Sequence, residues 1–204
     1  KGQQAHGAYP HLGIDPIVMA SQIVTALQTI RSRNLSPLEP SVVTVGLMQG
    51  GTRFNIIPHE VRMEGTVRTY DPDTRDTIER RMEEILDGIT LAGGGSYELD
   101  YERGSPATIN DPELTAQMAP TLERVMGANR VVIVDPVMGG EDFAFYSQQI
   151  PASMVALGVR PAGQEFYPQL HQPDYEFPDE AIAAGVRLHV ETARRFWSEG
   201  LGAR

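Results

Sequence analysis

Three of the four Asp-Pro pairs in this chain mark predicted helix starts, and they constrain the fold more than any other feature. An aspartate carboxylate can accept from the free backbone N–H groups of a helix start, and a proline at the first helical position needs no hydrogen-bond partner. Apolar residues follow the first two pairs at helical spacing and predict helices over about 16–33 and from 72 to the glycines at 93–95. These three pairs are Asp15-Pro16, Asp71-Pro72 and Asp111-Pro112.

Residues between and after these helices read as β-strands. The segment 41–48 is rich in β-branched residues, and 60–70 alternates between apolar and polar residues, with Arg68 on the polar face. We expect a further strand at 96–103. The pattern predicts two helices on one face of an antiparallel sheet, an α+β sandwich that covers residues 1–105.

The second half, 106–204, predicts a different organisation. The third Asp-Pro pair begins a helix that ends near Gly127, residues 142–149 form a short helix, and Asp179 caps a long terminal helix. Short apolar strands are expected at 131–134 and 154–159. Strands that alternate with helices indicate an α/β domain, and two strands are too few to close a sheet. Because residue 1 is also lysine and not methionine, we expect the chain to be part of a longer protein.

Charge and hydropathy exclude several classes of partner. The chain carries 27 acidic and 17 basic residues, a formal charge of -10, and a nucleic-acid partner would require a basic surface. Its apolar runs are much shorter than the roughly 20 residues of a membrane span. The absence of cysteine excludes disulfides and is weakly consistent with the cytoplasm. Small molecules or peptides are the expected ligands.

Two histidines stand in loop-like motifs at opposite ends of the chain. His6 lies in A-H-G-A-Y-P-H, and His171 lies in Q-L-H-Q-P, where Pro168 and Pro173 restrict the loop. Neutral imidazole is a common zinc ligand, whereas a loop histidine can equally be a solvated residue. His11 suits a capping or loop-fixing role, and the remaining two histidines are expected on the surface.

Five motifs in the same order resemble the C-terminal half of an amidohydrolase of the aminoacylase, hippurate hydrolase or auxin-conjugate hydrolase type, among the carboxypeptidase G-like metallopeptidases. The resemblance implies that 1–105 is a ferredoxin-like two-layer lid that mediates homodimerisation. It implies that 106–204 is the C-terminal part of a zinc-peptidase-like α/β catalytic domain whose N-terminal part lies outside this chain. The motifs are G-x-x-x-H-G-A-x-P-H-x-G-x-D-P-I at 2–17, G-G-x-x-x-N-I-I-P at 50–58, G-T-V-R-T at 65–69, M-G-G-E-D-F-A-F-Y at 138–146 and L-H-x-P at 170–173.

The same resemblance assigns roles to the two motif histidines. His171 would ligate one of two divalent metal ions (Zn, Mn or Co), and the other ligands and the catalytic glutamates would lie outside this chain. His6 would reach from the lid of one subunit into the active site of its partner and donate a hydrogen bond to the scissile carbonyl oxygen. A preorganised donor of that kind stabilises a transition state by roughly 3 to 4 kcal/mol.

Substrate-binding residues are expected on the lid and on the glycine-rich loop. Asn55 and Arg68 match the lid residues that bind a substrate carboxylate, and the planar guanidinium suits two parallel hydrogen bonds. A solvent-facing strand arginine and a turn-forming asparagine remain alternatives. Gly139 and Gly140 would line the pocket through their backbone, with Glu141 holding the loop. Asp142 could instead cap a helix.

The resulting functional hypothesis is metal-dependent hydrolysis of an N-acyl amino acid or a related small amide or peptide. This chain alone would be inactive, because one histidine cannot hold a catalytic ion. Two alternatives remain open: a non-catalytic dimerisation or ligand-binding module, and an aminopeptidase or dipeptidase of the same superfamily.

Overall fold

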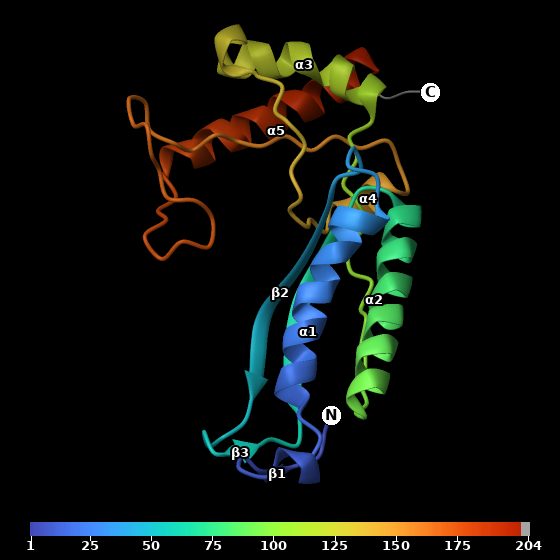
Figure 1. The fold of residues 1–204 in the computed structure, drawn as a ribbon. Coiled ribbons are helices and arrows are strands. Elements are labelled where there is room, and N and C mark those ends of the chain that lie inside the picture. Colours follow the sequence, from blue (N-terminus) through green and yellow to red (C-terminus); the bar gives the residue numbers. More distant parts are fainter. Residues whose placement is uncertain (201–204) are drawn as a thin grey trace. The chain divides into compact units, whose positions relative to one another are not determined.

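A computed structural model describes residues 1–200 of the chain, which divide into two compact units (Figure 1). Unit 1 comprises Lys1–Ala107 together with Val137–Gly140. Unit 2 comprises Thr108–Pro136 and the residues from Glu141 onward. The assignment of residues 1–105 and 106–204 to a lid and a catalytic part stays a prediction, and each unit is described by itself.

The two long helices of unit 1 begin at the Asp-Pro pairs, as predicted. Helix α1 spans Pro16–Thr29, and the Asp15 carboxylate accepts from the backbone N–H groups of its first turn. Helix α2 spans Pro72–Gly93, and Asp71 accepts from the Thr74 N–H at 2.7 Å. Helix α2 ends where Gly94 adopts a left-handed φ of 71°, a conformation that glycine adopts without steric cost.

The strands at 41–48 and 60–70 are also confirmed, and they pair with each other. Strand β2 (Ser41–Gly50) and strand β4 (Val61–Thr69) form an antiparallel two-stranded sheet, with a register shift between Val45 and Leu47. Along β4 the odd-numbered Met63 and Val67 pack against the core, whereas the even-numbered side chains are exposed. The predicted alternation therefore sets which face of the sheet the helices cover.

The core of unit 1 lies between the helix pair and this sheet. Figure 1 shows α1 and α2 side by side along the β2–β4 hairpin. Burial of apolar surface at about 25 cal/mol per Å² is the main term that holds these layers together. The buried cluster consists of Ile23, Leu27, Ile30, Ile78 and Leu86.

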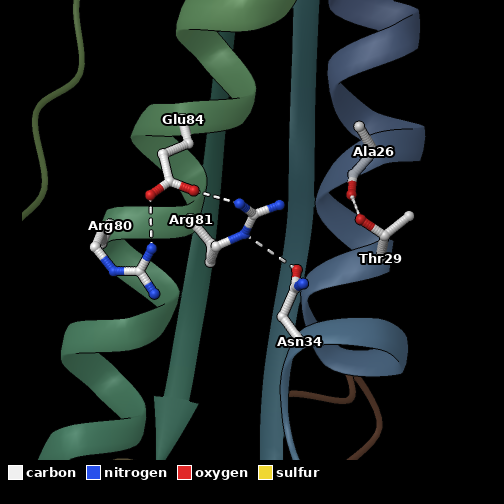
Figure 2. Close-up of polar contacts among 6 residues, drawn as sticks. All are labelled: Ala26, Thr29, Asn34, Arg80, Arg81 and Glu84. Atoms are coloured by element: carbon white, nitrogen blue, oxygen red, sulfur yellow. Dashed lines mark hydrogen bonds and ion pairs between the residues drawn. The ribbon is translucent and has the colours of Figure 1, made fainter.

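Polar contacts join the end of the first helix to the second. The residues Ile30–Asn34, labelled η2, continue α1 as a π-helical turn, and the Arg81 Nε donates to Asn34 Oδ1 at 3.2 Å (Figure 2). On the exposed side of α2, Glu84 accepts from both Arg80 and Arg81. The hydrogen bond from Arg80 is the main reason that the pKa of Glu84 is lowered.

Residues 96–103 do not form the predicted strand. Lys1 and Ser96 exchange backbone hydrogen bonds, 2.6 Å from the terminal amine to Ser96 O and 3.1 Å from Ser96 N to Lys1 O, and 97–103 then continue without a ladder partner in the described part of the chain. Tyr97 and Leu99 still pack against the core. The side chains of this segment are thus partly buried, but a strand also requires a neighbouring backbone.

Unit 2 is built on two helices in contact. Helix α3 spans Pro112–Met126 and begins at the third Asp-Pro pair, where Asp111 accepts from the Leu114 N–H. Helix α5 spans Glu180–Glu199, and its Arg195 donates to Thr121 Oγ1 of α3 at 2.6 Å. A single 3-10 turn, η3 (Ala128–Arg130), follows α3. The fold is thus mixed α/β, with small two-stranded sheets confined to unit 1 among the described residues.

Two strands and one side-chain cap expected in unit 2 are wrong, and one short helix is shorter than expected. The segments 131–134 and 154–159 have no strand assignment, because no described backbone runs beside them as a ladder; Asn110 instead exchanges two side-chain hydrogen bonds of 2.8 Å with the backbone of Met154. Asp179 precedes α5 but makes no side-chain cap bond, since its own backbone is helical (φ −58°, ψ −28°). The helix expected at 142–149 is the shorter α4 (Ala144–Ser147).

No helix among residues 1–200 combines the length and the apolar character needed to cross a lipid bilayer.

Two buried threonines, Thr69 in β4 and Thr74 in α2, predict opposite effects for the same substitution. Thr69 is a buried cross-strand partner of Ser41, and both hydroxyl oxygens lack a hydrogen-bond partner among the described residues. A buried hydroxyl without a partner is costly, so Thr69→Val should raise the free energy of unfolding by about 1 kcal/mol. Thr74 is equally buried, but its Oγ1 lies 2.9 Å from Asp71 Oδ2.

Thr74→Val is therefore the matched control, and it should lower the free energy of unfolding by about 1 kcal/mol because it removes a hydrogen bond to a charged group. Chemical denaturation of both variants beside the parent protein checks the prediction. A loss of stability in Thr69→Val equal to that in Thr74→Val would contradict it.

Candidate functional site

The residues expected at the site are distributed over both units, and the contacts within each unit show which of them lie together. Unit 1 holds five of them, and unit 2 holds two. Those of unit 1 are His6, Asn55, Arg68, Gly139 and Gly140, and those of unit 2 are Glu141 and His171.

His6 and Asn55 are neighbours at one end of unit 1. Strand β1 (Ala5–His6) pairs with strand β3 (Ile56–Ile57), and the Gly7 N–H donates to Asn55 O at 2.8 Å. A Cβ at Gly7 would lie 3.0 Å from the same oxygen, so the glycine permits this close approach. The sheet therefore joins two motifs that are about fifty residues apart in the sequence.

The imidazole of His6 is held by its own loop. The backbone N–H of Ala8 donates to His6 Nδ1 at 3.0 Å, and the ring lies 5.6 Å from that of Tyr9. A neutral imidazole has one acceptor and one donor nitrogen, so this bond assigns the proton to Nε2. The side chain is exposed, and its Nε2–H is directed away from the bond that fixes the ring. His6 is thus arranged as a neutral hydrogen-bond donor.

Arg68 lies against the glycine-rich loop. Its Nη1 donates to Thr66 Oγ1 and, at 2.9 Å, to Val67 O. A Cβ at Gly140 would lie over the face of the guanidinium, 3.5 Å from Nε, 3.6 Å from Nη2 and 3.7 Å from Cζ. Because glycine has no side chain, that position is empty. The structure therefore brings together two of the predicted substrate-binding residues, within unit 1.

The neighbours His6 and Asn55 lie at one end of the β2–β4 hairpin, and Arg68 lies at the other end. Strand β4 begins at Val61, close to β3, and Arg68 is seven residues further along (Figure 1). At about 3.3 Å per strand residue the separation is roughly 20 Å. Asn55 and Arg68 of one chain thus cannot contact the same small carboxylate, although the sequence analysis expected them to share it.

Glu141 holds the start of the next turn in unit 2. Its Oε1 accepts from the Phe143 N–H at 3.4 Å, which agrees with a loop-holding role. Asp142 is not the helix cap: α4 begins at Ala144, and Phe143 precedes it with a helical backbone and no side-chain cap bond. The alternative of an Asp142 cap is therefore wrong, because the N-cap position of α4 is Phe143.

His171 occupies an unusual backbone conformation. It lies at the third position of a turn closed by a 3.0 Å hydrogen bond from Gln172 N to Gln169 O, and its φ is +73°. It has the only positive φ of any non-glycine residue among those described. Such conformations cost about 1 kcal/mol or more and concentrate at functional sites.

Among residues 1–200 no three side chains of the metal-binding types converge. The chemistry of His171 fits a metal ligand, but one donor does not make a site. Any metal centre needs ligands beyond those that this part of the chain brings together.

The sequence analysis did not single out Thr66 or the Ala8 amide. Thr66 stands inside the G-T-V-R-T motif, two residues before Arg68 on the same face of β4, and that spacing was the available signal. The bond from Ala8 to the imidazole depends on a turn that closes within three residues, which composition does not reveal.

Comparison with known proteins decides the family. The family model described as "Peptidase family M20/M25/M40" matches residues 6–195. The chain belongs to this family. The resemblance of its motifs is thereby confirmed at that level, together with the mixed α/β fold.

Several relatives in sequence are named as deacetylases. The chain is 34% identical to the N-acetyl-L-cysteine deacetylase of Bacillus subtilis over 96% of its own length and 45% of that protein. It is 39% identical to the N-acetyldiaminopimelate deacetylase of a Geobacillus strain, over 78% of this chain and 42% of that protein. The chain spans about half the length of the curated relatives it matches.

A solved M20 structure gives the same fold. The YXEP protein of Bacillus subtilis, a dinuclear metal-binding peptidase of the M20 family, aligns with a TM-score of 0.64 and 27% identity over 94% of this chain and 48% of that one. The chain therefore belongs to a family of hydrolases, and its relatives include a metal-binding peptidase and deacetylases.

Proposed function

We propose that the protein containing this chain hydrolyses the amide bond of an N-acyl amino acid or a related small amide, as a metal-dependent M20 amidohydrolase. The observation that carries this proposal is the placement of a fixed neutral donor, His6, and an unpaired guanidinium edge, Arg68, on one unit. An N-acyl amino acid presents a carbonyl oxygen and a carboxylate, which these two groups would recognise. The names of the deacetylase relatives support the same substrate class.

His6 would stabilise the oxygen of the reacting amide. The Ala8 N–H keeps the proton of the neutral ring on Nε2, so the donor needs no rearrangement when negative charge develops on that oxygen. Asn55, whose backbone oxygen is bonded beside it, would contribute a second polar contact from the same end of unit 1.

Arg68 would anchor the substrate carboxylate. Its Nε and Nη2 form the edge that binds a carboxylate through two parallel hydrogen bonds, and the hydrogen bonds within the strand engage only Nη1. Gly139 and Gly140 would form the adjoining wall, with Glu141 holding the turn that follows.

The metal requirement is inferred from the family and from His171. Two divalent ions (Zn, Mn or Co) would supply Lewis acidity and an activated water when bound. From this chain His171 would be a ligand, with the remaining ligands outside the residues described. Location in the cytoplasm stays a prediction.

A homodimer formed through unit 1 would allow His6 and Arg68 to act on the same substrate despite their separation within one chain. Because His6 and Arg68 of one chain are roughly 20 Å apart along the hairpin, a small substrate could contact both only if one came from the partner subunit. Each active site would then combine the His6 and Asn55 of one subunit with the Arg68 of the other.

Mixed dimers test this arrangement directly. His6→Ala and Arg68→Ala should each be nearly inactive in the complete protein. Co-expression of the two should restore about a quarter of wild-type activity, because half of the randomly paired dimers are mixed and one of their two sites is intact.

Co-expression of two differently tagged His6→Ala chains is the control and should restore no activity. Native mass spectrometry of differently tagged subunits establishes that mixed dimers have formed. If mixed dimers are present and activity stays at the level of the single variants, the shared site is refuted.

A further inference from the structure

The guanidinium of Arg68 is bound on one side only. Both hydrogen bonds that the described residues accept from it engage Nη1, through Thr66 Oγ1 and Val67 O. Thr66 stands two residues before Arg68, so both side chains lie on the exposed face of β4. With Nη1 held, the plane of the guanidinium is restricted and the Nε–Nη2 edge is turned away from the strand.

The residue that lies over one face of the guanidinium has no side chain. A Cβ at position 140 would lie 3.5 Å from Nε, 3.6 Å from Nη2 and 3.7 Å from Cζ. Distances so nearly equal place it over the face of the guanidinium and outside the plane in which a carboxylate binds. Gly140 therefore leaves the Nε–Nη2 edge itself uncovered.

The neighbouring charges leave Arg68 without a carboxylate partner of its own. Glu64 lies on the same face of β4, but it is paired with Arg62 at 2.8 Å. No carboxylate among residues 1–200 forms an ion pair with Arg68, in a chain whose formal charge is -10. The positive edge is therefore preserved for a ligand from outside.

We propose that Thr66 is a positioning residue that presents the Nε–Nη2 edge of Arg68 to a carboxylate. The inference rests on the proposed function, since it makes the free carboxylate of the substrate the group selected at this subsite. Thr66 acts through Arg68 and contacts no substrate. Its hydroxyl removes rotational freedom from the guanidinium before the ligand arrives.

Kinetics of the complete protein separate this role from a structural one. Thr66→Val should raise KM about tenfold for an N-acetyl-L-amino acid, with kcat within about twofold, because one hydrogen bond to a charged group is lost. KM for the corresponding N-acetyl amino acid amide, which has no carboxylate, should not change. Thr66→Ser keeps the hydroxyl and should restore the parent KM.

Thr44→Val is the matched control, since Thr44 is the direct cross-strand partner of Thr66 and is also exposed. If Thr44→Val reproduces the effect of Thr66→Val, the strand and not the Thr66 hydroxyl is responsible, and the proposal fails.

A measurement without turnover keeps this inference separate from the proposed function. NMR signals of the Arg68 side-chain nitrogens should show slow guanidinium rotation in the parent and averaged rotation in Thr66→Val. Addition of propionate, but not propionamide, should shift the Nε–H signal of the parent. A shift with propionate in a protein that hydrolyses no N-acyl amino acid would refute the proposed function alone. Equal rotation in parent and Thr66→Val would overturn the positioning role.

Discussion

Replacement of His171 by alanine in the complete protein is expected to weaken metal binding at least about 100-fold and to abolish amide hydrolysis. Loss of a residue that only hydrogen-bonds to a metal ligand typically costs about 10- to 100-fold in affinity, and loss of the ligand itself should cost more. Metal content measured after dialysis against a weak chelator, together with hydrolysis of an N-acetyl amino acid, checks the prediction. His189→Ala, in the exposed part of α5, is the matched histidine control and should keep both.

The backbone of His171 supplies a second arm for the same experiment. Because its φ is +73°, alanine at this position retains the strain and glycine relieves it. In metal-free protein His171→Gly should therefore be more stable than His171→Ala by about 1 kcal/mol, the reverse of the usual order of these residues. Full metal content in both variants would show that His171 is not a metal ligand.

Replacement of His6 by alanine should leave metal content intact and lower kcat by about 100- to 1000-fold, the usual effect of removing one preorganised oxyanion donor. KM should change little, because the donor acts mainly on charge that develops during the reaction. Steady-state kinetics and metal analysis of one preparation give both quantities. The combination distinguishes His6 from His171, whose loss removes metal as well.

Two further variants sharpen the interpretation of His6. His6→Gln retains a side-chain N–H donor and should recover part of kcat, whereas His59→Ala, at an exposed position before β4, should behave as the parent. A variant His6→Ala with parental kcat would remove the oxyanion role and with it the need for a shared site in the dimer.

Helices were predictable because the hydrogen bonds that define them are local. The carboxylates of Asp15, Asp71 and Asp111 make the capping bonds that the Asp-Pro pairs predicted. The failure at Asp179 has the same local origin, since an aspartate whose own backbone is already helical cannot reach the free N–H groups.

Candidate site residues were predictable as residue types and motifs, but their grouping was not. The sequence expected Asn55 and Arg68 to share one carboxylate, yet the β1–β3 pairing holds Asn55 beside His6, and the hairpin carries Arg68 to the other end. The two ends of a strand are separated by its rise per residue, and neither motif carries that information.

Sequence by itself thus determined the helix starts, the buried face of β4 and the chemistry available at each motif, because caps, periodicity and side-chain type are properties of near neighbours. Tertiary structure alone decided that 96–103 and 154–159 are not strands, that Gly140 faces Arg68, and that Ala8 fixes the tautomer of His6. Ladders and site contacts join residues that are distant in the chain or depend on one turn geometry, so they form only when a partner backbone lies at the right distance.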